Sequence, residues 1–238
     1  MAKKLLLIGI DGATFHFILP FVKSGELKNL KEFMDNGSWG TLNSIVPPIS
    51  ITAWQCLCKG KNPGKLGIYD FVMLDQDSKK TKLFSWSSGD NIWDYLGRNG
   101  VKSVIFNVPG TYPPKLINGI FISGALTPAG SSDFAIPSQL VNELRKMIPS
   151  YEPELVEGNV IRNKFDFIPE MSKDLENKRK ILKYLIRNKE WDFFFFVISS
   201  IDTIQHFFWD DKDVILKFYK KIDDIIGEIT DGMADTNV

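Results

Sequence analysis

The chain has 238 residues, with 29 basic and 29 acidic side chains and therefore no net charge. This balance argues against binding of a nucleic acid polymer through a broad basic surface. A hydrophobic content of 44% excludes a chain that is disordered throughout. The longest apolar runs fall far short of the roughly 20 residues that span a bilayer, and the first lacks a signal-peptide cleavage site, so we expect a cytoplasmic protein without a membrane segment.

Apolar strand patterns alternate with helical patterns along the chain. The first run, LLLIGI at 5–10, is continuous, as in a strand buried on both faces of a parallel sheet. In chain order, the further expected elements are a helix at 26–36 with Gly37 as its left-handed cap, an extended segment at 39–46, a helix at 52–59, a helix from 92 towards 100, a strand at 101–108, a helix at 138–148, a helix after Ser172 as its N-cap, a strand at 192–199 and a helix at 215–229. This alternation predicts an α/β fold, a mostly parallel sheet with helices on both faces.

The middle and the end of the chain depart from this alternation. The segment 109–170 carries many of the prolines and glycines and one clear helix, so we expect it to be an insertion or cap within a single domain covering 1–238. The chain stops at 236–238, where the alternation calls for another strand. We therefore expect the sequence to be the N-terminal part of a longer protein.

Metal-competent side chains follow two of the most strand-like runs. Asp11 and Gly12 come directly after 5–10, and Asp202 and His206 follow the run FFFFVISSI. In open α/β sheets the ligand crevice lies beyond the carboxyl ends of the strands. A spacing of four places Asp202 and His206 on one face of a helical turn, where both can reach one ion such as zinc. The competing interpretations are helix caps for the aspartates and a packed core position for His206.

A third candidate lies in VPPISITAWQCLCKGKNPGKLGIYDF. Ser50 follows a proline-stiffened loop and precedes a short helix, whose N–H groups favour an anionic partner. A serine hydroxyl is a weak nucleophile until a base or a metal activates it, and its competing role is an ordinary N-cap. Cys56 and Cys58 have no second cysteine pair, which favours a structural role for both.

The ordered set of motifs resembles a known family. GIDG after the first strand, PPISITAW followed by KGKNPGKLGIYDF, NVPGTYPP with the later ISGALTP, and SSIDTIQHFFW together resemble the alkaline-phosphatase superfamily. Within it, the chain is most similar to the type I phosphodiesterase/nucleotide pyrophosphatase family, particularly its prokaryotic cytoplasmic members. The resemblance covers nearly the whole chain and implies an alkaline-phosphatase-like α/β fold.

The resemblance also implies a role for each candidate residue. Asp11 matches the metal-binding aspartate of the first strand, and Ser50 matches the residue that both binds metal and attacks phosphorus. Asp202 and His206 match the Asp-x-x-x-His pair that holds the other ion. The cofactors implied are two divalent ions, zinc or alternatively manganese, on either side of the phosphoryl group. The implied partner is a small-molecule phosphate ester.

The sequence departs from the family pattern at several points. Thr52 stands where the family loop has proline, which makes Thr52 the runner-up nucleophile. Leu66 replaces a common histidine, and Phe71 or its neighbour Asp70 falls where nucleotide pyrophosphatases place a phosphate-holding asparagine. The family's later Ser-Asp-His-Gly motif and a further histidine are absent from these 238 residues, so each ion would keep two protein ligands.

These observations predict a metal-dependent hydrolase of phosphate esters, with phosphodiester or nucleotide pyrophosphate bonds as the expected substrates and a covalent intermediate on Ser50. The missing ligands predict weak or no activity for this chain. The alternatives are other chemistry of the superfamily, namely phosphomonoesterase, sulfatase or phosphoglycerate mutase, and a degenerate binding module without catalysis. A haloacid-dehalogenase-type phosphatase is disfavoured because Gly9 occupies the position of that family's nucleophilic aspartate.

Overall fold

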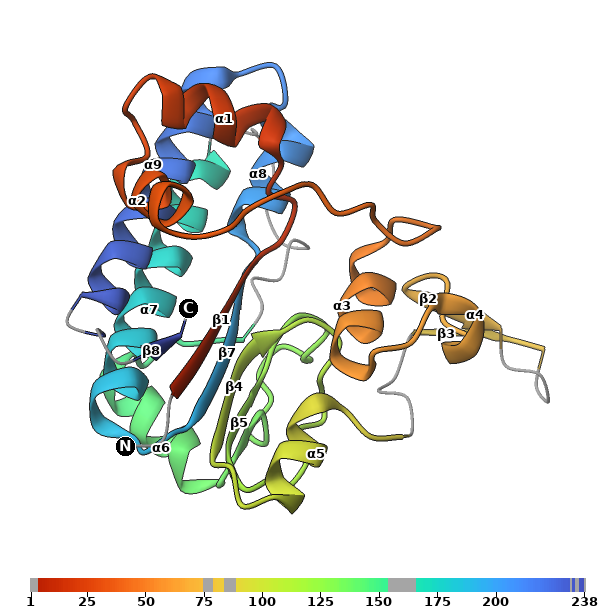
Figure 1. The fold of residues 1–238 in the computed structure, drawn as a ribbon. Coiled ribbons are helices and arrows are strands. Elements are labelled where there is room, and N and C mark those ends of the chain that lie inside the picture. The colour runs from red at the N-terminus through yellow and green to blue at the C-terminus, as the bar shows by residue number, and fades with distance from the viewer. Residues whose placement is uncertain are drawn as a thin grey trace. The chain divides into compact units, whose positions relative to one another are not determined.

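The computed structural model describes residues 4–74, 79–83, 89–153, 166–231, 233 and 236–237. The chain forms two compact units (Figure 1). The first unit comprises Met1–Leu42, Leu155–Glu190 and Val197–Val238, and the second comprises Asn43–Glu154 and Trp191–Phe196.

The first unit contains one complete strand, a two-residue strand and a set of helices. Its elements are β1 (Lys4–Ile10), α1 (Phe15–Lys23), α2 (Lys28–Asn36), α7 (Phe167–Asn188), α8 (Ser200–Phe208), α9 (Lys212–Thr230) and β8 (Thr236–Asn237). β8 pairs in parallel with β1, with Lys4 opposite Thr236. The isoleucines that predict the last helix are buried along α9, so the expected apolar stripe is its core-facing side.

The second unit contains most of the sheet. Its elements are α3 (Ser50–Lys59), α4 (Pro63–Leu66), β2 (Val72–Leu74), β3 (Thr81–Leu83), α5 (Ile92–Arg98), β4 (Ser103–Val108), β5 (Gly119–Ser123), β6 (Ala135–Ile136), α6 (Gln139–Met147) and the first four residues of β7 (Phe193–Ile198). The strand order here is β6-β5-β4-β7. β4 pairs in parallel with both β5 and β7, and only the pairing of β5 with β6 is antiparallel among these strands.

Burial along the strands confirms the predicted fold class. All six residues of β4 and all six of β7 are buried. Side chains alternate between the two faces of a strand, so complete burial requires cover on both faces. Continuous apolar runs such as FFFFVI are therefore strands of a mostly parallel α/β sheet.

Three local predictions are wrong. Gly37 is not a left-handed cap: its φ is −117° and its backbone is extended, although its N–H still donates to the carbonyl of Phe33 at 2.9 Å. Ser172 does not start a helix, because α7 begins at Phe167 and Ser172 lies inside it. The segment 39–46 forms no strand.

Several elements were not predicted. These are the helices α1 and α4, the hairpin of β2 and β3, and the strands β5 and β6. Since β5 pairs with β4, part of the segment 109–170 is a strand of the sheet, while residues 154–165 of that segment lie outside the described residues. At 236–237, where the chain was expected to stop short of a further strand, Thr236 and Asn237 form the two-residue strand β8. The treatment of 1–238 as one domain with an insertion stays a prediction.

No helix in the described part of the chain is both long enough and apolar enough to span a membrane.

Candidate active site

The chain turns sharply where β1 ends. Gly12 has a φ of +71°, in the left-handed region that residues with a Cβ avoid, and the N–H of Ala13 donates to the carbonyl of Ile10 at 3.2 Å. The N–H of Asp11 donates to the carbonyl of Ile198 at 2.9 Å. Within the first unit, the carboxyl ends of β1 and β7 therefore lie side by side, as the sequence predicts for strands of one parallel sheet.

The second pair of candidate residues lies on α8, directly after β7. Asp202 is in the first turn of α8, and the N-cap is Ser199, so Asp202 does not cap the helix. One turn later, Nε2 of His206 lies 3.4 Å from Oδ2 of Asp202. The side chain of His206 is 73% exposed, which excludes the alternative that it is a packed core histidine. Burial raises the pKa of the Asp202 carboxyl, and the neighbouring His206 opposes that rise.

Gly12 and Asp202 touch, which joins the two motifs. A Cβ placed on Gly12 would lie 2.7 Å from the Cα of Asp202 and 2.8 Å from its Oδ1, so only glycine fits at this position. Nε2 of Gln205 donates to the carbonyl of Gly12 at 2.7 Å. Gln205 was not predicted from the sequence, because nothing in its spacing distinguishes it from other buried residues of α8. It fixes the Asp11–Gly12 turn against the helix that carries Asp202 and His206.

Ser50 belongs to the second unit. It is the first residue of α3, after Ile49 as the N-cap, and it is half-buried. The N–H of Ile49 donates to the carbonyl of Pro47 at 3.0 Å, which shapes the loop leading into the helix. The approach of Ser50 to Asp11, Asp202 and His206 stays a prediction.

Thr52, the runner-up nucleophile, is in a different environment. It is fully buried, and its hydroxyl oxygen has no hydrogen-bond partner. The half-buried Ser50 is therefore the more accessible of the two hydroxyls. Cys56 and Cys58 lie on the same helix, both buried and both free. Burial raises the pKa of Cys58 to about 12, in agreement with a structural role.

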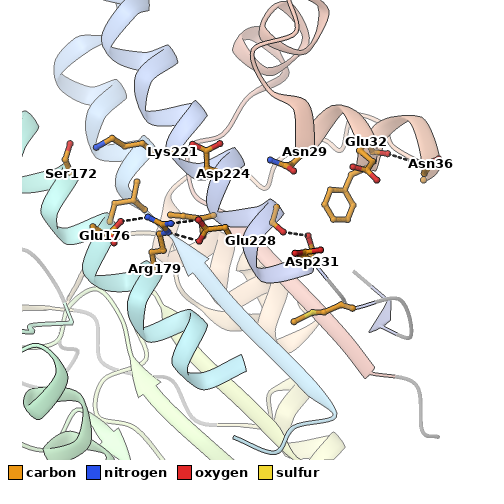
Figure 2. A pocket seen from close by; sticks show the side chains of 17 residues that line it. Asn29, Glu32, Asn36, Ser172, Glu176, Arg179, Lys221, Asp224, Glu228 and Asp231 are labelled. Carbon is orange, nitrogen blue, oxygen red and sulfur yellow. Dashed lines mark hydrogen bonds and ion pairs between the residues drawn. The ribbon is translucent and has the colours of Figure 1, made fainter. Parts of the chain in front are cut away.

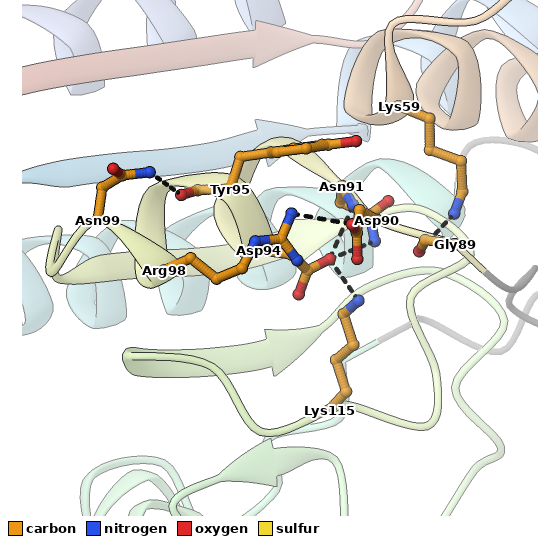
Figure 3. A network of polar contacts seen from close by, with 9 residues as sticks. All are labelled: Lys59, Gly89, Asp90, Asn91, Asp94, Tyr95, Arg98, Asn99 and Lys115. Carbon is orange, nitrogen blue, oxygen red and sulfur yellow. Dashed lines mark hydrogen bonds and ion pairs between the residues drawn. The ribbon is translucent and has the colours of Figure 1, made fainter.

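The end of α3 is tied to the start of α5 within the second unit (Figure 3). Nζ of Lys59 donates to the carbonyl of Gly89 at 3.2 Å, and burial lowers the pKa of Lys59. The carboxylate of Asp94 accepts from the N–H of Asn91 at 2.7 Å and from Nζ of Lys115 at 2.5 Å. The bond from Lys59 thus ties the end of α3 to the segment before α5, and the bonds to Asp94 fix the start of α5.

Asp202 and His206 in the first unit carry the types of side chain that bind divalent cations. A carboxylate and an imidazole are suitable ligands for zinc or manganese. In the part of the chain that the structure describes, no group of three or more His, Cys, Asp or Glu side chains could hold one ion. Asp202 and His206 thus supply two of the four or so ligands that zinc takes.

A pocket of about 1310 Å³ lies elsewhere in the first unit, between α2, α7 and α9 (Figure 2). Arg179 in its wall pairs with Glu228 and with Glu176, and Lys183 adds a contact to Glu228 at 3.2 Å. None of the candidate residues lines this pocket. The ion pairs of Arg179 and Lys183 with Glu228 hold α7 against α9.

The mostly parallel α/β sheet is the fold of the alkaline-phosphatase superfamily. The sequence profile described as type I phosphodiesterase / nucleotide pyrophosphatase matches residues 5–238, and the chain belongs to this family. No curated protein gives a significant sequence match.

Solved structures of distant sequence share the fold. Phosphonoacetate hydrolase from Sinorhizobium meliloti 1021, in complex with phosphonoacetate, is 14% identical with a TM-score of 0.69, over 98% of this chain and 54% of that chain. Murine ectonucleotide pyrophosphatase / phosphodiesterase 5 is 13% identical with a TM-score of 0.60, over 96% of this chain and 52% of that chain. The human protein of the same name is 14% identical with a TM-score of 0.57 and the same coverage, 96% and 52%. The chain therefore spans about half the length of these structures.

Proposed function

We propose that this chain carries part of the active site of a metal-dependent hydrolase of phosphodiester or nucleotide pyrophosphate bonds, with Ser50 as the nucleophile. The observation that carries the proposal is the contact between Gly12 and Asp202, which brings Asp11 to the same sheet edge as Asp202 and His206. Membership of the type I phosphodiesterase/nucleotide pyrophosphatase family supports the reaction class.

Ser50 would act by nucleophilic substitution at phosphorus. Its Oγ forms a bond to phosphorus while the bond from phosphorus to the leaving oxygen breaks, and the hydroxyl proton passes to solvent. The leaving oxygen takes up a proton from solvent, and the remaining ester group stays on phosphorus, so the intermediate is a phosphodiester of Ser50. Water then attacks this phosphorus, the bond from phosphorus to Oγ breaks, and Oγ regains a proton from the attacking water, which regenerates Ser50 and releases a phosphomonoester. As the first residue of α3, which is 10 residues long, Ser50 lies beside the N–H groups of a helix N-terminus. These groups favour the negative charge of a phosphoryl group.

Metal binding in the proposal uses four side chains. Asp11 and Ser50 would hold one ion, and Asp202 and His206 the other. Two bound divalent ions, zinc or manganese, would supply positive charge to activate the hydroxyl and to stabilise the leaving oxygen. The Asp11–Gly12 turn and Gln205 contribute by keeping the ligands in place.

Nucleotides are the substrate class that the relatives favour. The family is described as a nucleotide pyrophosphatase family, and murine ectonucleotide pyrophosphatase / phosphodiesterase 5 was solved as an inactive variant in complex with AMP. Phosphonoacetate hydrolase, with the same fold, was solved with phosphonoacetate. A panel of phosphodiesters, phosphomonoesters and sulfate esters separates the proposed activity from the other chemistry of the superfamily.

The test is hydrolysis of bis(4-nitrophenyl) phosphate with added Mn²⁺ or Zn²⁺ by the full-length protein that contains these residues, in the wild type and in four variants. Ser50→Ala and His206→Gln are expected to lower kcat by about 100-fold or more. Thr52→Ala separates the two candidate nucleophiles and is expected to keep most of the activity. Asp210→Asn, an exposed acid beyond α8, is the matched control and is expected to leave the rate unchanged. Equal rates with and without the Ser50 hydroxyl would refute the proposed nucleophile.

Metal content separates this proposal from a binding module that has lost catalysis. The full-length protein is expected to bind zinc stoichiometrically, and His206→Gln is expected to weaken that binding, as measured by competition with a chromogenic chelator. If the wild type binds no zinc, the non-catalytic binding module is favoured.

A further inference from the structure

Apolar packing anchors the first turn of α3, the turn that begins with Ser50. The N-cap residue, Ile49, has an apolar side chain that accepts no hydrogen bond from the helix. The hydroxyl of Thr52, in the same turn, is buried without a hydrogen-bond partner and adds no polar contact. Ile51, directly after Ser50, is completely buried and forms an apolar cluster with the buried Ile68. The position of this turn therefore depends on what packs around Ile51.

Leu126 connects this apolar cluster to the central sheet. It lies in the loop after β5 and packs against the buried pair of Ile51 and Ile68. Two other partly buried side chains pack there as well, Leu66 of α4 and Met73 of β2. Both of these come from the segment that follows α3 along the chain, whereas Leu126 follows a strand of the sheet. All five residues belong to the second unit.

The backbone of Leu126 has a conformation that leucine normally avoids. Its φ is +73°, in the left-handed region where the Cβ of an L-residue is crowded. Glycine adopts this region without that cost. Residues with such strain persist where the surrounding structure fixes them, and they occur preferentially at functional sites. The leucine thus combines an unfavourable backbone conformation with a side chain that packs on the turn after Ser50.

Hydrogen bonds fix the backbone on both sides of Leu126. The N–H of Gly110, in the loop after β4, donates to the carbonyl of Ala125 at 2.9 Å. Oγ1 of the buried Thr127 donates to the carbonyl of Gly124 at 2.6 Å. These two loops carry the motifs NVPGTYPP and ISGALTP, which have no role in the proposed function. Their contacts supply the constraint that a left-handed leucine requires.

We propose that Leu126 is a positioning residue for Ser50. Its side chain, presented by the two interlocked loops, packs against Ile51 and thereby fixes the turn that carries the Ser50 hydroxyl. The inference rests on the proposed function, because the role of Ser50 comes from it. Displacement of a reacting group by about 1 Å costs on the order of 100-fold in rate. Loss of the contact is therefore expected to lower kcat more than it changes substrate binding.

The experiment uses the full-length protein that contains these residues and compares two variants. Leu126→Gly removes the side chain and accepts the positive φ without strain, so it is expected to fold. It is expected to lower kcat for bis(4-nitrophenyl) phosphate about tenfold or more while KM changes less than about twofold. Leu126→Met restores an apolar side chain and is expected to keep kcat within about threefold of the wild type.

Hydrogen exchange provides a readout that does not depend on activity. In Leu126→Gly, amide exchange measured by mass spectrometry is expected to be faster in peptides that cover the start of α3 and unchanged in β4. Lys79→Gly is the matched control, because Lys79 also has a left-handed φ, +54°, but an exposed side chain. This variant is expected to match the wild type in kcat and in exchange.

The outcomes separate the inference from the proposed function. Exchange at the start of α3 that stays unchanged in Leu126→Gly, or that rises equally in β4, overturns the inference. If the wild type hydrolyses the phosphodiester and Leu126→Gly has the same kcat, the inference fails and the proposed function stands. If the wild type hydrolyses no phosphodiester but exchange rises only at the start of α3, the proposed function fails and the anchoring of this turn by Leu126 stands.

Discussion

Asp223 on α9 supplies the missing N-terminal cap of α2. The N-cap residue of α2, Leu27, has no side chain that accepts a hydrogen bond. Instead, the carboxylate of Asp223 accepts from the N–H of Leu30 at 2.7 Å and from the N–H of Asn29 at 3.0 Å. Its Oδ2 also accepts from Nδ2 of Asn29 at 3.1 Å, and Asp223 is only 3% exposed. One buried carboxylate thus docks α2 on α9.

The cost of Asp223→Ala follows from these contacts. Loss of an N-cap costs about 0.5–2 kcal/mol, and a hydrogen bond to a charged group contributes about 1.5–3 kcal/mol. The three bonds are not additive, and water can reach part of the freed N–H groups, so we expect a loss of about 3 kcal/mol in the free energy of unfolding. Asp223→Asn keeps one oxygen acceptor without the charge and is expected to lose about 1–2 kcal/mol.

Urea unfolding followed by far-UV circular dichroism measures these differences, and a melt should show a fall in Tm of roughly 6–12 °C for Asp223→Ala. The control is Asp224→Ala, because Asp224 is the next residue and its side chain is exposed. A substitution at such a surface position is expected to stay within about 0.5 kcal/mol of the wild type. The capping argument is wrong if Asp223→Ala unfolds at the same urea concentration as Asp224→Ala.

Three further predictions concern other parts of the chain. Gly12→Ala forces a Cβ into the left-handed region and to within 2.7 Å of the Cα of Asp202, so zinc affinity is expected to fall about 10- to 100-fold in a chelator competition; an unchanged affinity would contradict the proposed contact. Hydrogen bonds from Arg179 lower the pKa of Glu228 in the folded chain. The stability that the Glu228 carboxylate contributes is therefore fully present above its pKa in the unfolded chain, and it is lost as the pH falls through its lower pKa in the folded chain. Glu228→Gln should therefore unfold more easily at pH 7, and the difference should shrink as the pH falls below the unfolded pKa and vanish below the lowered folded pKa. A difference that stays constant through this acid range would refute the prediction. Cys58 has a pKa of about 12 and should not react with Ellman's reagent at pH 8 until guanidinium unfolds the chain; rapid reaction of the native protein would show that it is not buried.

The sequence predicted the elements whose apolar pattern is long and unbroken. The run FFFFVI became β7, and the isoleucine stripe became α9, because burial on these faces dominates the local energetics. The helix α1 was missed because it is apolar on nearly every side and contains Pro20, which is typical of a break. The strand β5 is short and lies between turn-forming residues, so its pairing with β4 depends on tertiary contacts that no local pattern records.

The candidate site was partly predictable for a similar reason. Asp11, Asp202 and His206 follow strands that are easily recognised, and the order of parallel strands brings their ends together. Gln205 was not predictable, because its bond to the carbonyl of Gly12 depends on how α8 tilts against the turn. The role of Ser50, the identity of the metal ions and the cytoplasmic location stay predictions.

The strand β7 has a consequence for how the protein is made. Its first four residues complete the sheet of the second unit, yet the rest of that unit ends at Glu154. During synthesis, residues 43–154 therefore emerge from the ribosome well before β7, the strand that pairs with β4, has been made. During that interval one edge of an apolar strand has no neighbour, the state in which nascent chains aggregate or recruit chaperones. Expression of the second unit as a contiguous fragment would make this exposure permanent.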